Sequence, residues 1–158
     1  MSLWDAKRNL YHIATEHSEV ISHFAKVKYI ERATRVYRRK RLIMNDKTIK
    51  ELAVELTVET TAICDSVKGR SVFVNQLLRS CSSIGANAHE AKYAQSKADF
   101  ISKIEISLKE CYETEYWLEI LFKVNAIDEI TYKALINKCG TIRRKLIASV
   151  TTAKNRKE

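Results

Sequence analysis

The chain has 158 residues, a net charge of +9, no proline and only three glycines. This length allows one domain with a hydrophobic core. The scarcity of Gly and Pro excludes collagen-like and Pro-rich disordered chains, and also a Gly-rich phosphate loop. No stretch of the sequence approaches the ~18 consecutive apolar residues of a membrane span. The four cysteines form no C-x-x-C pair, which favours reduced thiols. Together these features lead us to expect a soluble, cytoplasmic, nearly all-helical protein.

The positive charge is concentrated toward the N-terminus. Residues 1–44 carry ten Lys and Arg against four Asp and Glu, whereas residues 45–158 carry eighteen against fifteen. The densest part, residues 26–41, has a single acid, Glu31. Such a block attracts nucleic acid or an acidic partner; a solvated helical tail is the alternative interpretation. Its candidate phosphate ligands are Arg38, Arg39, Lys40 and Arg41.

The first apolar pattern of the chain predicts a helix. Its members alternate at spacings of three and four residues, as one stripe of a helix does. They are Leu3, Ala6, Leu10, Ile13, His17, Val20, Phe24 and Val27. Residues 1–44 are therefore predicted to form a basic helical N-terminal extension.

Residues 45–158 predict four more helices, each with a recognisable start. Thr48 and Glu51 have the spacing of a capping box, and this helix is expected to stop at Lys68 and Gly69, where glycine suits a left-handed turn. The expected caps of the next three helices are Ser71, Ser96, which has Asp99 in the first turn, and Asp128. The corresponding helices are expected at about 72–93, 97–124 and 129–154.

Each of these four helices carries an apolar line that is expected to face a core. The lines are Ile49, Leu52, Leu56, Ile63 and Val67; Phe73 or Val74, Leu77, Cys81, Ile84, Ala88 and Ala91; Phe100 or Ile101, Ile104, Leu108, Cys111, Glu115, Leu118 and Phe122; and Ile130, Ala134, Leu135, Cys139, Ile142, Leu146 and Val150. Helices of about 22–28 residues with connections of two to four residues are typical of an antiparallel up-down-up-down four-helix bundle. Small residues around Gly85 indicate that two helices approach closely there.

Catalytic and metal-binding patterns are missing from the sequence. Di-metal bundles need Glu-x-x-His pairs, whereas residues 45–158 contain only His89, and Tyr93 occupies the place of a second His in H-E-x-x-H. We interpret His89 as structural and predict no cofactor and no metal. Ser82 and Ser83 point to different faces from any base on the same helix, so no catalytic residue is predicted.

Two surface clusters remain open to interpretation. Glu113, Glu115, Tyr116, Trp117 and Glu119 alternate acids with aromatic residues, which suits a solvated face beside a subunit contact or, alternatively, a peptide- or base-stacking site. Arg143, Arg144 and Lys145 fan over about 200° of the last helix, so at least two are expected to be exposed. They are interpreted either as phosphate ligands or as a solvated face.

Residues 75–104, NQLLRSCSSIGANAHEAKYAQSKADFISKI, and residues 109–118, KECYETEYWL, carry a family resemblance. They resemble the bacterial four helix bundle protein family, which includes the proteins encoded in intervening sequences of 23S ribosomal RNA genes. That family is related in fold to the accessory variability determinant of diversity-generating retroelements. The resemblance covers roughly residues 47–154. Residues 1–43 lie outside it, and Met44 stands where relatives usually begin.

The resemblance implies a homo-oligomer, typically a pentameric barrel of bundles with a basic surface, and no catalytic residue. Its motif positions are Arg79, Ser83, Ile84, Asn87, Glu90, Ser96, Asp99, Phe100, Glu113, Glu115 and Trp117. From these, we expect Arg79 to pair with Glu113 or Glu115 on an adjacent helix. We expect Asn87 to tie helices together. Two departures from the family are His89 and the lack of Gly after Glu90.

Taken together, these features predict a non-enzymatic homo-oligomer that binds structured RNA or other nucleic acid through basic surfaces. The alternative is a protein-interaction scaffold, such as an accessory subunit of a reverse transcriptase. Lys92 and Lys97, which flank the turn after the second bundle helix, are further candidate phosphate ligands. The predicted subunit contacts are the outward aromatic residues Tyr93, Tyr112, Tyr116, Trp117 and Phe122. No contact with a membrane is expected.

Overall fold

The computed structural model describes residues 27–36, 38 and 47–156. The chain divides into two compact units, Met1–Asp46 and Lys47–Glu158. In the first unit residues 27–36 and 38 are helical, and Val27, Tyr29 and Val36 are exposed there. The rest of the expected N-terminal stripe, from Leu3 to Phe24, lies outside the described residues.

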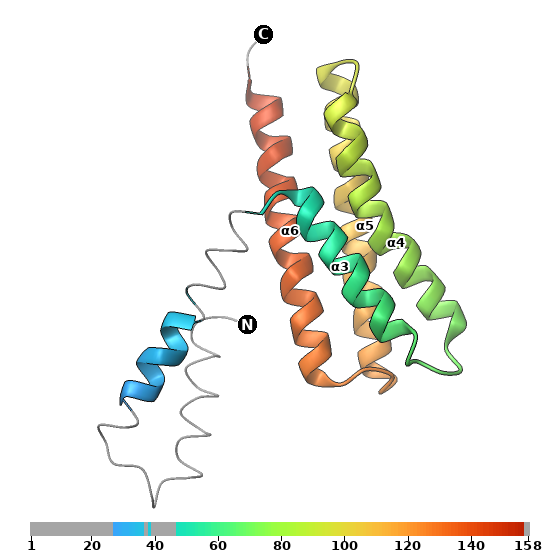
Figure 1. Ribbon diagram of the computed structural model, residues 1–158. Helices are drawn as coiled ribbons and strands as arrows, with labels where there is room; N and C mark the ends of the chain where they lie inside the picture. The colour runs from blue at the N-terminus through green and yellow to red at the C-terminus, as the bar shows by residue number, and fades with distance from the viewer. Residues whose placement is uncertain (1–26, 37, 39–46, 157–158) are drawn as a thin grey trace, which may run out of the picture. The chain divides into compact units, whose positions relative to one another are not determined.

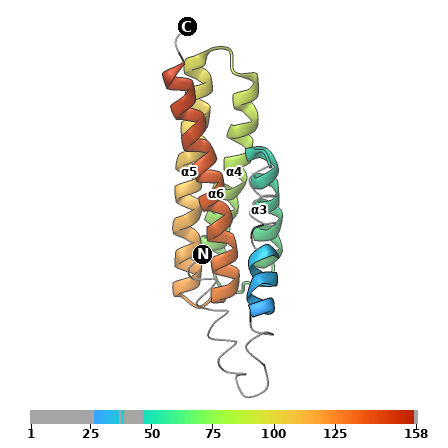
Figure 2. The same ribbon diagram turned by 90° about the vertical axis from the view of Figure 1, so that its left-hand side faces the viewer.

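The described part of the second unit is entirely helical. Its elements are α3 (Ile49–Cys64), α4 (Ser71–Glu90), the short 3₁₀ helix η1 (Ala91–Tyr93), α5 (Lys97–Lys123) and α6 (Glu129–Asn155). Each helix runs antiparallel to the next, and α3 packs against both α4 and α6 (Figures 1 and 2). This confirms the predicted fold class, a helical bundle preceded by an N-terminal extension.

Three of the four predicted helix starts are confirmed in atomic detail. The Thr48 hydroxyl accepts the N–H of Glu51, and the Glu51 carboxylate accepts the N–H of Thr48, which completes a capping box. Ser96 accepts the N–H of Asp99 at 3.1 Å, and Asp128 accepts the N–H of Thr131 at 2.7 Å. The fourth prediction is wrong, because Arg70 is the N-cap of α4 and Ser71 is already helical.

The first two bundle helices are shorter than expected, at 16 and 20 residues. The expected continuation of α3 to Lys68 is wrong. The backbone hydrogen bonds shift from the helical i−4 spacing to i−3 at Ser66 and Val67. The Ser66 hydroxyl also donates to the carbonyl of Ile63 at 2.6 Å. Gly69 does adopt a left-handed conformation, with φ +70, but it lies in the turn beyond the end of the helix.

The core follows the predicted lines, with local exceptions. Leu52, Leu56, Leu77, Ile84, Leu118, Leu135, Ile142 and Leu146 are almost completely buried. Ile130, expected on the inner line of α6, is instead 83% exposed. Ala134 is also exposed. Both lie in the first turns of α6, at the end of the bundle, where the helix has not yet entered the core.

The four cysteines are free thiols inside the bundle, one on each helix. Burial raises the pKa of the Cys64 thiol to about 11 and raises that of Cys81 as well. The neighbouring Cys111 thiol, together with burial, raises the pKa of Cys139. Neutral thiols are poor nucleophiles and poor metal ligands, so these side chains act as small apolar core residues.

Helices α3 and α4 meet at a pair of very small residues. A Cβ added to Gly85 would lie 3.3 Å from the Cβ of Ala53, which is tight even for ordinary van der Waals contact. A glycine inside a helix costs about 1 kcal/mol relative to alanine. The close approach of the two helices offsets that cost, as the sequence pattern indicated.

We predict that Gly85→Leu destabilises the bundle by about 1–3 kcal/mol, because the new side chain has to push α3 away from α4. Chemical denaturation followed by circular dichroism measures the change. Ser82→Leu is the matched control, since Ser82 is exposed on the same helix and its hydroxyl bonds only the Arg79 carbonyl of that helix. Equal stability of the two variants would show that the crossing is not tightly packed.

Candidate functional site

The described residues were predicted to include no metal site. No three His, Cys, Asp or Glu side chains among them come together to hold a metal ion. His89 is half-buried and packs edge-on against Tyr93, with ring centroids 5.4 Å apart. Its Nδ1 is buried and has no hydrogen-bond partner in the described structure.

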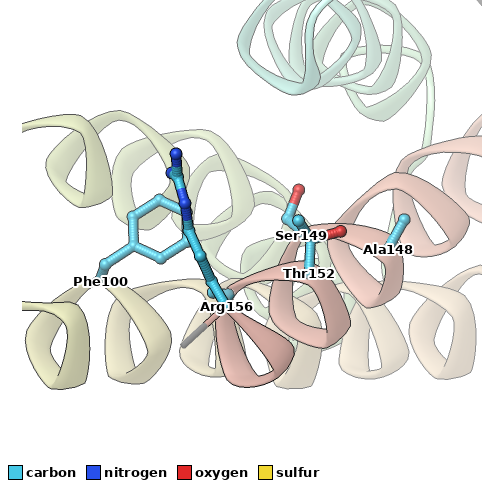
Figure 3. Close-up of a pocket in the computed structure, with 6 residues that line it drawn as sticks. Phe100, Ala148, Ser149, Thr152 and Arg156 are labelled. Carbon is cyan, nitrogen blue, oxygen red and sulfur yellow. The ribbon is translucent and has the colours of Figure 1, made fainter. Parts of the chain in front are cut away.

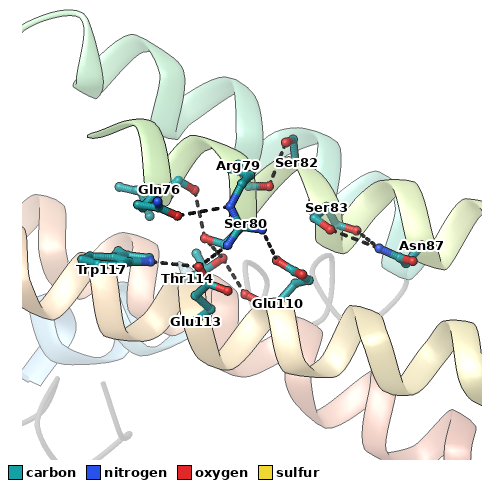
Figure 4. Close-up of polar contacts among 11 residues, drawn as sticks. Gln76, Arg79, Ser80, Ser82, Ser83, Asn87, Glu110, Glu113, Thr114 and Trp117 are labelled. Carbon is teal, nitrogen blue, oxygen red and sulfur yellow. Dashed lines mark hydrogen bonds and ion pairs between the residues drawn. The ribbon is translucent and has the colours of Figure 1, made fainter. Parts of the chain in front are cut away.

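A polar network joins α4 to α5 on the surface of the bundle (Figure 4). Arg79 donates to Gln76 at 3.2 Å and pairs with Glu113 across the helix boundary. A second contact, of 3.8 Å, links the Arg79 guanidinium to Glu110. The indole of Trp117 donates to the same Glu113 oxygen at 3.1 Å. The predicted pairing of Arg79 is therefore with Glu113, and Glu115 has another partner.

Hydrogen bonds tune the charges in this network. The bond from Trp117 and the pairing with Arg79 lower the pKa of Glu113 from its usual 4.5. The same carboxylate raises the pKa of Arg79. Both side chains are therefore held in their charged forms, and they are oriented by partners on two helices.

Aromatic side chains flank this network on α5. Trp117 stacks on Phe73 of α4 with centroids 6.1 Å apart, and Tyr116 meets the indole edge-on at 4.9 Å. Tyr112 and Tyr116 are about half exposed, at 49% and 55%. Of the five aromatic residues expected to face outward, Trp117 and Phe122 do so only in part, because Trp117 is covered by Phe73 and Phe122 stacks on Tyr132 at 4.6 Å.

The basic run of α6 differs from its expected exposure. Arg143 donates to Glu115 of α5 at 3.0 Å and lies 5.6 Å from the centre of the Tyr112 ring. Arg144 is exposed and donates to Thr141 at 3.0 Å. Lys145 is half-buried and is not free of contacts with other groups. The expectation of two exposed cations is wrong, because the acidic face of α5 lies beside this part of α6 and holds Arg143.

The other motif positions have mainly structural roles. Asn87 donates to the carbonyl and hydroxyl of Ser83, at 2.9 and 3.1 Å, within α4. Its expected role as a tie between helices is therefore not seen among these bonds. Glu90 pairs with Lys103 of α5. Asp99 accepts the N–H of Gln95 at 3.1 Å, next to the cap formed by Ser96.

The remaining candidate cations lie in different places. Arg38 is exposed in the helical segment of the first unit, and Arg39, Lys40 and Arg41 lie outside the described residues. Lys92 and Lys97 are exposed beside the turn that joins η1 to α5. The ammonium of Lys97 donates to the carbonyl of Arg156 at 2.6 Å, so the C-terminal end of α6 meets this turn.

A hollow next to this turn was missed by sequence reasoning. It lies between the first turns of α5 and the last turns of α6, and Figure 3 shows its lining side chains. They are Phe100, Ala148, Ser149, Thr152, Ala153 and Arg156. The positions on α6 are spaced by three and four residues, which is the one signal by which the sequence could have indicated a shared face.

The fold places the chain in the class of small antiparallel helical bundles. Most of its ion pairs and side-chain hydrogen bonds lie on the surface of the bundle. The model of the 23S rRNA-intervening sequence protein family matches residues 45–148, and the chain belongs to that family. A crystal structure of a protein of unknown function from the S23 ribosomal protein family of Bacteroides thetaiotaomicron is similar. It shares 39% identity and a TM-score of 0.62, over 65% of this chain and 98% of that one. No curated protein matches this chain significantly.

In the part of the chain that the structure describes, no helix combines the length and apolar character needed to cross a membrane.

We predict that the network around Glu113 stabilises the bundle only when its carboxylate is charged. A lowered folded pKa means that this stabilisation is complete above the usual pKa of 4.5 and is lost as the pH falls through the folded value. Glu113→Gln should therefore lower Tm by a few degrees at pH 7, a modest amount because the side chain is partly exposed. The difference from the unmodified chain should shrink at about pH 3.

Glu119→Gln is the control, because Glu119 is an exposed acid on the same helix and pairs with no cation within 4 Å among the described residues. Its Tm should follow that of the unmodified chain at both pH values. A Glu113→Gln deficit that is equally large at pH 7 and at low pH would mean that packing, not charge, is what the substitution removes.

Proposed function

We propose that the protein is a non-enzymatic, self-associating helical bundle that binds structured RNA or other nucleic acid through basic surfaces. The observation that carries this proposal is the distribution of ion pairs. Most acids of the bundle have partners within it. Some form ion pairs with Lys or Arg, as Glu55, Glu105 and Glu115 do, and others cap a helix, as Asp128 does. The positive charge that is left over is therefore displayed on the surface, where it attracts phosphates.

The family adds support of a different kind. Its name refers to proteins from intervening sequences of 23S ribosomal RNA, and the similar crystal structure is assigned to the S23 ribosomal protein family. The first name mentions ribosomal RNA and the second mentions the ribosome. A basic bundle with exposed cations fits such a setting, and the proposal assigns no reaction to the protein.

Self-association is the second part of the proposal. The exposed Tyr112 and Tyr116 lie on one face of α5, next to the Arg143–Glu115 pair. Tyrosines with a neighbouring arginine are enriched at protein interfaces. The same face favours a protein-interaction scaffold, such as an accessory subunit of a reverse transcriptase, as the second candidate function.

We predict an assembly of five copies at micromolar concentration. Multi-angle light scattering should then give a mass close to five times the 18.2 kDa of the chain. Substituting both tyrosines, Tyr112→Glu with Tyr116→Glu, should shift the mass toward that of one chain, because the charges cannot be buried unpaired. Val58→Glu is the control, because Val58 is an exposed residue of α3, and this variant should leave the assembly intact. A monomeric unmodified chain would contradict self-association.

We also predict salt-dependent binding to an RNA hairpin, measured by fluorescence anisotropy between about 50 and 200 mM salt. Each phosphate contact should add about 0.7–0.9 to the slope of log affinity against log salt. Arg144→Gln should remove at most one such contact and leave stability within ~0.5 kcal/mol. Arg143→Gln should instead lower stability, because it leaves Glu115 without its partner. No binding at the lowest salt would refute nucleic-acid binding.

A further inference from the structure

The bundle has an open end, where α4, α5 and α6 project beyond the first residue of α3 (Figures 1 and 2). Helix α3 has 16 residues, whereas α5 and α6 have 27 each. The capping box at Thr48 marks the start of α3, so α3 does not extend along α4, α5 and α6 to this end of the bundle. The hollow lined by Phe100 and Arg156 lies at this open end.

The walls of the hollow combine an aromatic ring, hydroxyl groups and a guanidinium. Phe100 and Ala153 supply an apolar floor, while Ser149 and Thr152 carry hydroxyls. Phe100 and Arg156 both line the hollow, as Figure 3 shows. The hollow is open to solvent and has a volume of about 390 Å³.

Three cations surround the same end of the bundle. Lys92, Lys97 and Arg156 are exposed, and none of them has a carboxylate of another described residue within 4 Å. Of the acids at this end, Glu90 pairs with Lys103 and Glu105 with Lys154, while Asp99 accepts the N–H of Gln95 and Glu51 accepts the N–H of Thr48. Lys97 is held against the end of α6 by its bond to the Arg156 carbonyl. The open end therefore keeps an excess of positive charge next to an aromatic surface.

We infer that the open end is the site at which the protein holds a single-stranded segment of nucleic acid. A base stacks on Phe100 beside the Arg156 guanidinium, and the flanking phosphates contact Lys92, Lys97 and Arg156. Aromatic stacking beside a cationic groove is the common physical basis of sequence-tolerant single-strand binding. The hydroxyls of Ser149 and Thr152 offer hydrogen bonds at the edge of the base.

Nucleic acid fits this site better than an acidic protein helix does. A docked helix needs a long apolar groove with several anchor positions, whereas this hollow is short and has one aromatic residue. Its cations lie on three separate elements at this end of the bundle, η1, α5 and the end of α6. Such an arrangement suits phosphates on both sides of one stacked base.

This inference rests on the proposed function, and the experiment separates the two. Fluorescein-labelled U15 RNA is titrated with the full chain over a range of salt concentrations. The charge variant replaces Lys92, Lys97 and Arg156 with Gln. The matched control replaces Lys68, Arg70 and Lys123, which are exposed at the opposite end of the bundle. Thermal melts confirm that both variants fold.

The charge variant should lower the slope of log affinity against log salt by about 2, because each single-strand phosphate contact contributes about 0.7. The control variant should keep the slope. Phe100→Leu should weaken binding at least about fivefold with an unchanged slope, since it removes stacking and no charge. Phe100→Tyr keeps the ring and should retain binding, which guards against a folding defect.

The alternatives give different results. Equal losses in the charge variant and the control would place binding on diffuse surface charge and overturn this site, while the proposed function would stand. A poly-aspartate peptide that binds as tightly as U15, and loses affinity in the same variant, would show that the open end selects acidic chains and not nucleic acid. No binding of the unmodified chain to either U15 or a hairpin would refute the proposed function itself.

Discussion

Small hydroxyl side chains along the boundary between α4 and α5 set the register on which the rest of the bundle depends. Ser107 donates to the carbonyl of Ile84 at 2.8 Å, and Thr114 donates to the hydroxyl of Ser80 at 3.0 Å. All three hydroxyl residues are fully buried. A slip of either helix would leave the Ser107 hydroxyl buried without its partner, which costs about 1–3 kcal/mol, whereas Ser80 and Thr114 would keep the carbonyls of Leu77 and Glu110 on their own helices. This register brings Arg79 opposite Glu113 and joins the two helices at the surface as well.

Helix boundaries were the most predictable part of the fold, because they depend on local chemistry. The caps at Thr48, Ser96 and Asp128 follow from side chains within three residues of each helix start. The exposure of Ile130 was not predictable in this way, since it depends on how the neighbouring helices pack around the start of α6. The buried Ser107 and Thr114 were missed because a hydropathy pattern counts a hydroxyl as an outward residue.

The surface clusters also include contacts that the sequence predicts and contacts that it does not. The pairing of Arg79 with either Glu113 or Glu115 could be anticipated, because these are motif positions of the family on adjacent antiparallel helices. The partner of Arg143 could not be anticipated, since the rotation of α6 decides which of three consecutive cations meets the acidic side of α5. The hollow at the open end joins residues from the start of α5 and the end of α6, which only a folded structure brings together.

The arrangement of charge matters more than its sum in this protein. Residues 45–158 carry a surplus of only three positive charges, which is modest for a nucleic-acid-binding domain. Yet the ion pairs are not distributed evenly over the bundle. Acids such as Glu90, Glu105 and Glu115 are matched to cations on neighbouring helices and so add little to the outer field. At the open end, the same matching leaves Lys92, Lys97 and Arg156 without a carboxylate partner among the described residues, at the end of the bundle that also carries Phe100.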